Sequence, residues 1–479
     1  MFSFTTIPQY HEELLQHDTN CVEAITHYLQ QIDKNKRLNA FTEVYAEEAI
    51  GKALLLDEKR KKGEPLKKLH GVVIAIKDVI CYKDHTVTAA SKILSGFKSV
   101  FSATAVQRLL HEDAIIIGSC NCDEFAMGST NENSVYGKVL NALDETKVPG
   151  GSSGGSAVAV QAGMCMLSLG SDTGGSVRQP ADFCGIIGFK PSYGSISRYG
   201  LIAYASSFDQ IGIFGNEVDD IALLFDVMRG PDEFDSTAFQ NAGNEGLNKA
   251  EPNRKYKIAY FEEALHHPSL DNEIKEKILS FIDQLRSAGH TVEAVEFDLL
   301  DHVVPTYYVL TTAEASSNLS RFDGVRFGHR TEVPVSELTD FYKHTRSEGF
   351  GKEVQRRIML GTFVLSAGFY DAYYSKAQQV RRLLVDKTTA IFNEFDAVMM
   401  PVSPSTAFEF GAHKDDPIEM YLADIYTVFA NLTGVPGIAL PLFRHSNGMP
   451  FGVQVMTNKQ DDVTLLRLSR YLMEEQARQ

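Results

Sequence analysis

Short, wholly apolar runs alternate along this chain with stretches in which apolar residues recur at helical spacing. Residues 72–76 are five consecutive apolar residues, residues 114–118 form a second apolar run, and residues 104–111 between them keep a helical pattern. Continuous apolar runs of this length are typical of strands that are buried on both faces of a sheet. Strands that alternate with helices in this way predict an α/β fold.

The remaining pattern predicts helices at both ends of the chain and in one long insertion. Apolar residues at positions 22, 25, 29 and 32 form a helical stripe, so we expect the first 65 residues to be helical. Later we expect a helix at 218–228, a polar surface excursion at 230–256, a strand at 258–260, a helix at 272–288, a strand at 291–297, a mostly helical insertion at about 305–394, strands at 397–401, 437–442 and 451–457, and a last helix at about 461–477. A chain of 479 residues can hold two or three average domains, but a large α/β enzyme can also be one.

The segment from residue 149 to residue 180 is the strongest candidate for a functional site. It contains two glycine-serine clusters, at residues 150–156 and 174–176, on either side of a run of small and apolar residues. A flexible linker would continue into polar, low-complexity sequence, whereas both clusters here adjoin residues that must pack. Because glycine lets a backbone approach a ligand closely, two such clusters can aim several N–H groups and hydroxyls at one point. We expect a helix at 156–166 whose N-terminus faces the first cluster, and a loop beside the site at 123–134.

Two familiar uses of glycine-rich segments make demands that this sequence meets poorly. A phosphate-binding P-loop needs a lysine after its last glycine, and no lysine follows either cluster. Residues 151–155 do match G-x-S-x-G with Ser153 at the centre, which is the pattern of a nucleophile elbow. That elbow needs an apolar strand immediately before it, and the preceding ten residues are polar and include a proline. An elbow at Ser153 remains a minor alternative.

The third chemistry is acyl transfer by a serine that is activated without histidine. No histidine lies between His111 and His266, so a histidine base would have to come from a distant part of the chain. Lys77, at the end of the apolar run 72–76, can act as a base if burial keeps its amine neutral. Residue statistics alone favour the alternative that this lysine extends from the strand end into solvent.

Composition limits the class of protein. With 44% hydrophobic and 23% charged residues the chain is a typical globular protein, and a formal net charge of −16 argues against a broad nucleic-acid-binding surface. The basic run at 59–68 is interpreted as a solvated helix end, with a contact to RNA or a partner as the alternative. The start of the chain lacks a basic segment followed by an apolar core, no apolar run is long enough to span a bilayer, and the cysteines lack paired spacing. We therefore expect a cytoplasmic protein without a metal site, and reduced thiols at Cys21, Cys81, Cys120, Cys122, Cys165 and Cys184.

Lys77 and the two glycine-serine clusters together resemble the amidase signature family, from about residue 66 to residue 455. The resemblance implies a Ser-cisSer-Lys triad in which Ser176 is the nucleophile, Ser152 the bridging serine after a cis peptide bond, and Lys77 the base. It also implies the family's fold: a single α/β domain over residues 1–479, built on one large mixed sheet flanked by helices.

Residues around the nucleophile fit this chemistry. A serine hydroxyl both donates and accepts, so the bridging serine can pass a proton from the nucleophile to the lysine. Backbone N–H groups at the second cluster would stabilise the developing oxyanion, and losing one such donor typically costs about 3 kcal/mol. The oxyanion hole that we expect is formed by Thr173, Gly174 and Gly175. We expect Asp172 and Arg178 to form a supporting ion pair, with a surface pair as the alternative.

Three long stretches of the C-terminal half, at 307–328, 346–363 and 415–437, are similar to the A subunits of bacterial glutamyl-tRNA(Gln)/aspartyl-tRNA(Asn) amidotransferases, a branch of the family. The resemblance implies that the chain hydrolyses glutamine and supplies ammonia to a B subunit, which activates Glu-tRNA(Gln) with ATP and Mg²⁺, while a C subunit completes a heterotrimer. It assigns Arg357 to the α-carboxylate of glutamine, Asp424 to the α-ammonium and Tyr307 to the pocket. The adjacent Arg356 is an alternative to Arg357.

The same resemblance leaves this chain without a cofactor of its own, without membrane contact, and with tRNA held mainly by the B subunit. Two other functions remain open. A free-standing amidase acting on small amides would keep Lys77, Ser152 and Ser176 but would not need Arg357 and Asp424. A non-catalytic assembly subunit would keep only the fold, and the intact triad speaks against it.

Overall fold

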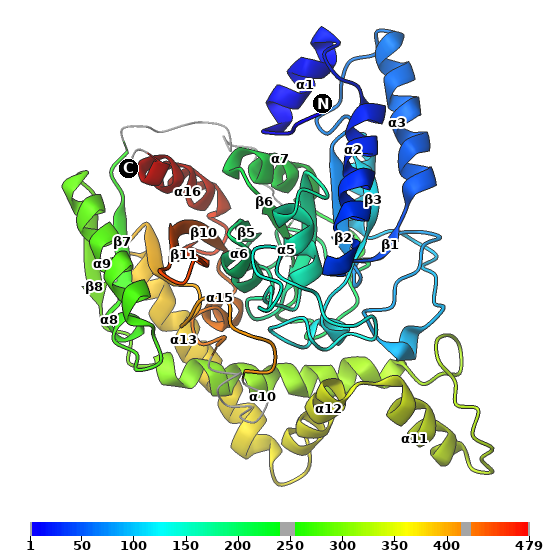
Figure 1. The fold of residues 1–479 in the computed structure, drawn as a ribbon. Coiled ribbons are helices and arrows are strands. Elements are labelled where there is room, and N and C mark those ends of the chain that lie inside the picture. The colour runs from blue at the N-terminus through cyan, green and yellow to red at the C-terminus, as the bar shows by residue number, and fades with distance from the viewer. Residues whose placement is uncertain (1, 240–253, 413–422, 478–479) are drawn as a thin grey trace.

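One mixed sheet of eleven strands runs through the computed structural model, which describes residues 2–239, 254–412 and 423–477 (Figure 1). The strand order is β1-β3-β2-β4-β6-β5-β10-β11-β9-β7-β8. The strands are β1 (Phe41–Val44), β2 (Val73–Lys77), β3 (Ile115–Cys120), β4 (Leu167–Asp172), β5 (Ile187–Lys190), β6 (Gln210–Gly215), β7 (Lys257–Phe261), β8 (Thr291–Val295), β9 (Ala397–Pro401), β10 (Gly437–Arg444) and β11 (Pro450–Thr457). This architecture confirms the predicted α/β class with a single large mixed sheet.

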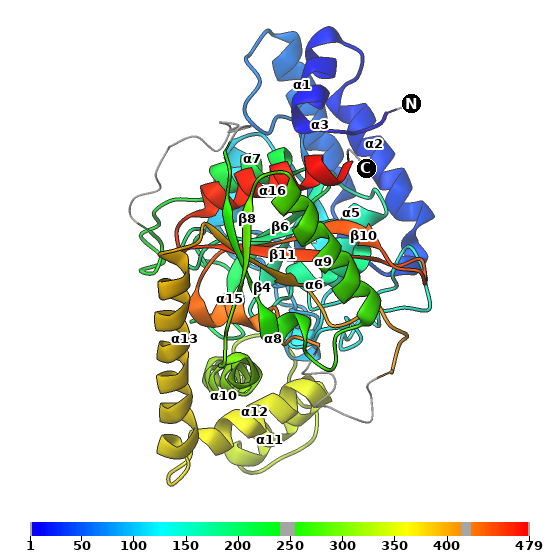
Figure 2. The ribbon, with the colours of Figure 1, turned by 90° about the vertical axis from the view of Figure 1, so that its left-hand side faces the viewer.

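Helices cover both faces of the sheet and one end of the molecule. Figure 2 shows α7 and α16 above strands β10 and β11, with α6 and α15 below them. The long helix α10 runs along the lower side of the molecule in Figure 1 and packs against α12, α13 and α15. The helices are α1 (Ile7–Gln16), α2 (Cys21–Lys34), α3 (Ala46–Lys61), α4 (Thr104–His111), α5 (Gly154–Gln161), α6 (Arg178–Cys184), α7 (Val218–Met228), α8 (Glu262–Leu265), α9 (Asn272–Ser287), α10 (Leu300–Asn318), α11 (Leu338–Gly349), α12 (Lys352–Val364), α13 (Lys376–Phe392), α15 (Val428–Thr433) and α16 (Asp462–Ala477).

The predicted elements agree with the structure where periodicity is strong and fail where elements are short. Helices α4 and α7 and strand β9 have the expected bounds, and the other expected strands and the last helix agree within a few residues. The prediction of an all-helical N-terminal region is wrong, because β1 (Phe41–Val44) pairs antiparallel with β3 at the edge of the sheet. Four residues are too few to show a period-2 pattern. Residues 240–253 of the expected surface excursion lie outside the described residues.

The segment between the two glycine-serine clusters differs from the predicted single helix. Helix α5 ends at Gln161, Gly163 takes a left-handed φ of 64°, and residues Leu167–Asp172 form strand β4. Strand β4 pairs in parallel with β2, and Ile76 lies opposite Leu169. Because the carboxyl ends of parallel strands meet at one edge of a sheet, Lys77 and the residues that follow β4 are brought to the same place.

Several expectations about the surface and the thiols can be compared with the structure directly. Among the described residues no helix is long and apolar enough to cross a membrane, and no group of three or more His, Cys, Asp or Glu side chains is placed to hold a metal ion. The six cysteines are buried and form no disulfide. In the basic run Lys59 pairs with Asp113, Lys61 with Glu58 and Lys68 with Asp226, which favours the solvated helix end.

Candidate active site

The amine of Lys77 is buried at the end of β2 and is surrounded by serine hydroxyls. Its Nζ lies 2.7 Å from Ser152 Oγ, 2.9 Å from Ser153 Oγ and 2.9 Å from Ser171 Oγ. The side chain has no exposed surface, which excludes the alternative of a lysine that reaches solvent. Burial lowers the pKa of Lys77 to about 8, so part of the population is neutral near pH 7.

The surrounding hydroxyls direct the lone pair of the neutral amine. Ser153 Oγ donates its proton to the carbonyl of Ser171 at 3.2 Å, so it can only accept from Lys77. A neutral amine donates two hydrogens and accepts one, which leaves its lone pair for Ser152 or Ser171. Ser152 is the nearer of these two, so the amine is placed to receive a proton from the Ser152 hydroxyl.

Lys190 is the other lysine that is fully buried among the described residues, and it is not equipped as a base. Its Nζ donates to the carbonyl of Pro191 at 2.8 Å, and burial lowers its pKa to about 7. A carbonyl oxygen has no proton to give, whereas each of the three neighbours of Lys77 is a hydroxyl. Both lysines have a lowered pKa, so the pKa alone does not single out a base. The surrounding hydroxyls distinguish Lys77 as the candidate base.

Ser152 is held in a turn that packs between two polar side chains. The Gly151–Ser152 peptide bond is cis. The Gly151 N–H donates to Gln179 Oε1 at 3.0 Å, and the Ser152 carbonyl accepts the N–H of Asp123 at 3.0 Å. A Cβ added at Gly151 would lie 2.3 Å from Asp123 Oδ2, so a glycine is needed where this carboxylate packs against the turn.

The structure excludes the nucleophile-elbow alternative for Ser153. The residues before it form no strand, and its side chain is completely buried. Its hydroxyl is occupied by Lys77 and by the Ser171 carbonyl. A serine without access to substrate cannot serve as the nucleophile.

Ser176 follows β4 and is the more accessible of the two triad serines. Its side chain is 8% exposed, against 0% for Ser152. Lys77 and Ser152 are joined by a hydrogen bond, whereas no hydrogen bond joins Ser152 to Ser176 among the described residues. Catalytic hydrogen bonds are often completed only when substrate binds. The missing hydrogen bond between Ser152 and Ser176 lies where the substrate is expected.

In the loop before Ser176, the N–H of Gly175, one of the three expected oxyanion donors, is already engaged by another group. The Gly175 N–H donates to Asp172 Oδ1 at 2.8 Å. A carboxylate is a stronger acceptor than a carbonyl. Gly175 is therefore corrected from an oxyanion donor to a conformational requirement: its φ is 120°, and an added Cβ would lie 2.2 Å from Thr427 Oγ1. Thr173 and Gly174 remain the candidate donors.

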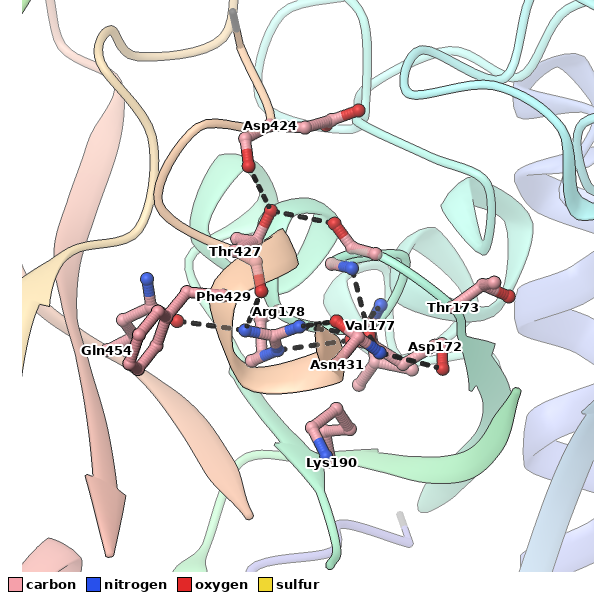
Figure 3. A network of polar contacts seen from close by, with 12 residues as sticks. Asp172, Thr173, Val177, Arg178, Lys190, Asp424, Thr427, Phe429, Asn431 and Gln454 are labelled. Atoms are coloured by element: carbon pink, nitrogen blue, oxygen red, sulfur yellow. Dashed lines mark hydrogen bonds and ion pairs between the residues drawn. The ribbon is translucent and has the colours of Figure 1, made fainter. Parts of the chain in front are cut away.

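Asp172 and Arg178 form a fully buried ion pair that fixes this loop, not a surface pair (Figure 3). Arg178 Nη2 lies 3.0 Å from Asp172 Oδ1, and Arg178 also donates to the Thr427 carbonyl at 2.7 Å and to Gln454 Oε1 at 2.9 Å. Burial alone would raise the pKa of Asp172, but the guanidinium of Arg178 holds that pKa well below its ordinary value. The carboxylate thus remains charged and binds the N–H groups of Gly175 and Val177.

The structure decides between the two adjacent arginines of α12. Arg357 is 5% exposed, and its Nη1 donates to the hydroxyl of Tyr204 at 2.7 Å. Its guanidinium carbon lies 5.4 Å from the centre of the Tyr308 ring. Arg356 is exposed and pairs with one oxygen of Glu353, whose other oxygen binds Arg357 Nε at 2.9 Å. Arg357 is the arginine that faces the interior.

Asp424 lies on the other side of Tyr308 and is also buried. The Tyr308 hydroxyl donates to Asp424 Oδ2 at 3.1 Å, and Ser129 Oγ lies 3.0 and 2.9 Å from the two carboxylate oxygens. Burial raises the pKa of Asp424 to about 6, against the opposing effect of these hydroxyls and of Arg357. One cation and one anion therefore flank a single tyrosine, and both are charged at neutral pH.

Tyr307 connects this pair of charges to the nucleophile loop. A Cβ added at Gly174 would lie 2.4 Å from the Tyr307 hydroxyl, so the phenol covers the loop directly. The neighbouring Tyr308, on the same helix α10, reaches Asp424. Tyr307 therefore lies against the nucleophile loop, and its neighbour Tyr308 contacts both Arg357 and Asp424.

Comparison with known proteins agrees with this geometry. A family model described as Amidase matches residues 23–466, which is most of the chain. The chain belongs to the Amidase family. The resemblance seen in the sequence is thereby confirmed.

Named relatives of this Amidase-family chain match it over nearly its whole length. A protein from Chlorobium phaeobacteroides, named as the A subunit of glutamyl-tRNA(Gln) amidotransferase, is 45% identical over 475 residues, covering 99% of each chain. A protein of the same name from Chlorobaculum tepidum is 48% identical over 473 residues, covering 96% of this chain and 95% of its own length. The crystal structure of the corresponding A subunit from Thermotoga maritima superposes with a TM-score of 0.78 at 38% identity, covering 96% of this chain and 93% of that one.

Several side chains of this Amidase-family site escape prediction from the sequence. Ser129 lies in the loop that was expected beside the site, but nothing in the loop marks which hydroxyl reaches Asp424. Ser171 precedes Asp172 at the end of an unpredicted strand. Tyr308 is adjacent to Tyr307, and Thr427 follows Asp424 by one helical turn, so both could have been found by scanning the neighbours of the assigned residues.

Proposed function

We infer that this chain is the glutamine-hydrolysing A subunit of a glutamyl-tRNA(Gln) amidotransferase. Relatives of that name at 45–48% identity over almost the full chain support this assignment. The observation that supports glutamine as the substrate is the opposed pair Arg357 and Asp424 beside the nucleophile loop. A free α-amino acid presents one carboxylate and one ammonium, and arginine can bind a carboxylate through two parallel hydrogen bonds.

The residues of the triad account for the cleavage of the side-chain amide. Ser176 Oγ attacks the carboxamide carbon, its proton passes to Ser152, and the proton of Ser152 passes to the neutral amine of Lys77. The amide oxygen becomes an oxyanion that the N–H groups of Thr173 and Gly174 stabilise. The proton then returns through Ser152 to the leaving nitrogen, the C–N bond breaks, and ammonia leaves a glutamyl ester on Ser176. Water attacks this ester by the same proton path and releases glutamate.

Recognition places the reacting amide at the end of an extended substrate. Arg357 holds the α-carboxylate and Asp424 the α-ammonium, and Tyr307 lies between this pair and Gly174. The two charged contacts fix the α-carboxylate and the α-ammonium, which orients the side chain of the substrate toward Ser176. A simple amide without the two charges would lack this orientation, so the residues argue against a free-standing amidase of small amides.

The remaining steps of the overall reaction belong to partner subunits. In this proposal a B subunit receives the ammonia, activates Glu-tRNA(Gln) with ATP and Mg²⁺ and holds the tRNA, and a C subunit completes the heterotrimer. The net charge of −16 on this chain agrees with a tRNA site elsewhere. A subunit that delivers ammonia needs no cofactor for its own step.

The decisive experiment replaces the nucleophile in the assembled complex. We expect Ser176→Ala to abolish release of glutamate from glutamine and glutamine-dependent formation of Gln-tRNA(Gln), because the acyl acceptor is missing. Amidation with added ammonium chloride should continue, because the partner site is intact. Glutamine-dependent turnover by the Ser176→Ala complex would overturn the assignment, and loss of the ammonia-dependent reaction would indicate a damaged complex.

A further inference from the structure

The side chain of Thr427 joins the two halves of the proposed site. Thr427 is completely buried and flanks the N-terminus of helix α15 (Val428–Thr433). Its Oγ1 lies 2.8 Å from the carbonyl oxygen of Gly174 and 3.2 Å from the carbonyl oxygen of Asp424 (Figure 3). One hydroxyl therefore contacts both the nucleophile loop and the turn that carries the proposed ammonium ligand.

The single proton of this hydroxyl is directed at Gly174. The Asp424 carbonyl already accepts the backbone N–H groups of Thr427 at 3.1 Å and Val428 at 3.2 Å, so it has no need of the hydroxyl. The Gly174 carbonyl is the nearer acceptor. The side chain also fills the space that a Cβ on Gly175 would occupy, so the loop and Thr427 fit closely.

This contact clamps one peptide unit from both sides. The carbonyl of Gly174 and the N–H of Gly175 belong to the same planar peptide group, which precedes the peptide bond between Gly175 and Ser176. Thr427 binds the carbonyl, and Asp172 Oδ1 accepts the N–H at 2.8 Å. Arg178 fixes Asp172 and also donates to the Thr427 carbonyl, and Thr427 belongs to the same turn as Asp424. The orientation of this peptide group thus depends on both halves of the site.

We propose that the Thr427 hydroxyl is a positioning group that couples occupancy of the ammonium site at Asp424 to the alignment of the loop carrying Ser176. This proposal rests on the proposed function, because it takes the α-ammonium of glutamine as the ligand of Asp424. An ammonium bound to Asp424 fixes the position of the turn at residues 424–427. The hydrogen bond from the Thr427 hydroxyl to the Gly174 carbonyl then transmits that position to the Gly174–Gly175 peptide. Thr427 touches no reacting atom and acts only through the loop.

The test compares two substrates in the complex of this chain with its co-expressed partner subunits. L-glutamine engages Asp424, whereas glutaramate keeps the carboxylate and carboxamide of glutamine but lacks the α-amino group. Thr427→Val removes the hydroxyl at constant shape, and Thr427→Ser keeps it. Thr433→Val is the matched control, since Thr433 is a buried threonine of the same helix whose hydroxyl bonds to the Phe429 carbonyl, away from the site.

We expect Thr427→Val to lower kcat for glutamine about 10- to 100-fold, with less than a threefold change in KM. The same variant should change kcat for glutaramate less than threefold, because that substrate never engages the coupling. Thr427→Ser and Thr433→Val should stay within threefold of wild type on both substrates. Thermal unfolding of the two valine variants should show similar melting temperatures, which separates coupling from loss of stability.

Other outcomes would overturn the coupling or the proposed function. An equal loss of kcat on both substrates would make Thr427 a merely structural residue and overturn the coupling. Unchanged kcat for glutamine in Thr427→Val would overturn it as well. If the wild-type complex hydrolyses glutaramate as fast as glutamine, or hydrolyses neither, the proposed function itself fails, whatever Thr427 does.

Discussion

The two halves of the site are built in different ways. The catalytic end comprises Lys77 and Asp172 at the ends of the parallel strands β2 and β4, Ser176 and Arg178 directly after β4, and Ser152 in the turn before α5. The recognition end comprises Tyr307, Arg357 and Asp424, which come from α10, α12 and the turn before α15. The first set lies at and around the strand ends, whereas helices outside the sheet and the turn before α15 hold the second.

This difference separates chemistry from specificity. The catalytic end is fixed by buried hydrogen bonds that involve no substrate, such as Arg178 with Asp172, so it can cleave any amide that reaches Ser176. In the proposed function the recognition end carries the charges that select an α-amino acid. Substitutions at the catalytic end should therefore slow every amide substrate, whereas those at the recognition end should affect only substrates that carry the charged group concerned.

The largest effect is expected from Lys77→Met, which removes the base and keeps an apolar stem of similar size. We expect kcat for glutamate release to fall about 10⁴-fold, because no other group can accept the proton of Ser152. Glutaramate should suffer the same loss. The measurement is steady-state glutaminase activity of the assembled complex with both substrates.

Lys190→Met is the control for Lys77→Met, because it removes the other buried lysine without removing a hydroxyl-bound base. The folded Lys190→Met complex should keep kcat within a few-fold of wild type. A Lys77→Met complex with kcat within tenfold of wild type would place the base elsewhere.

Arg178→Met should produce the next largest effect, on stability as well as on rate. Removing one partner of a buried ion pair leaves the Asp172 carboxylate without its cation, which typically costs about 3–5 kcal/mol. We expect a lower denaturant midpoint and a loop that no longer orders Ser176. Equilibrium unfolding by urea measures this loss.

The matched control is Arg382→Met, which removes an arginine from an exposed i,i+4 pair with Asp386 on α13. Its unfolding midpoint should equal that of the wild type. Equal midpoints for Arg178→Met and wild type would contradict the role given to the buried pair.

The contrast between the two ends also explains what could be predicted from the sequence. The catalytic end lies within short segments whose glycines and apolar runs have local physical meaning, so the two glycine-serine clusters and Lys77 could be singled out from the residues alone. The roles of Lys77, Ser152 and Ser176 came from the resemblance to the family. The short strand β1 and the strand β4 were missed, because few residues carry too little periodicity to identify them. Gly175 was misassigned because its N–H is taken by Asp172, a competition that only three-dimensional placement reveals.

The recognition end was accessible only through resemblance to a family. Arg357 and Asp424 lie 67 residues apart in the chain, from 357 to 424, and no local pattern connects them. Their common neighbour Tyr308 and the hydroxyl of Ser129 become visible only when α10 and the loop at 123–134 are packed together. Long-range placement of single side chains has no signature in one sequence.

The pH dependence of kcat/KM should distinguish the two ends with an effect of about tenfold per pH unit. Lys77 must be neutral, and its pKa is about 8, so activity should be lost as the pH falls through 8. Asp424 must be ionised, and its pKa is about 6, so glutamine should lose further activity below pH 6. The slope against pH should therefore steepen from one to two near pH 6 for glutamine and remain one for glutaramate.

A profile for glutamine that stays flat between pH 6 and pH 8 would contradict a neutral Lys77 as the base. If the slope steepens near pH 6 with glutaramate as well, the group that titrates near pH 6 is not the ligand of the α-ammonium. Stability of the complex at each pH is checked by returning samples to pH 8 before assay.

The smallest effect is expected from Ser129→Ala, which removes a hydroxyl that donates to Asp424. A hydrogen bond to a charged group contributes about 1.5–3 kcal/mol, but the Tyr308 hydroxyl still holds the carboxylate, so we expect KM for glutamine to rise only about 3- to 10-fold. Because the lost hydrogen bond had lowered the pKa of Asp424, the steepening near pH 6 should move to higher pH. Ser366→Ala, at a half-buried serine whose hydroxyl bonds to the Phe363 carbonyl, is the control and should change neither quantity. A fall in kcat with unchanged KM in Ser129→Ala would instead place Ser129 at the catalytic end, and the division between the two ends would then be wrong at this loop.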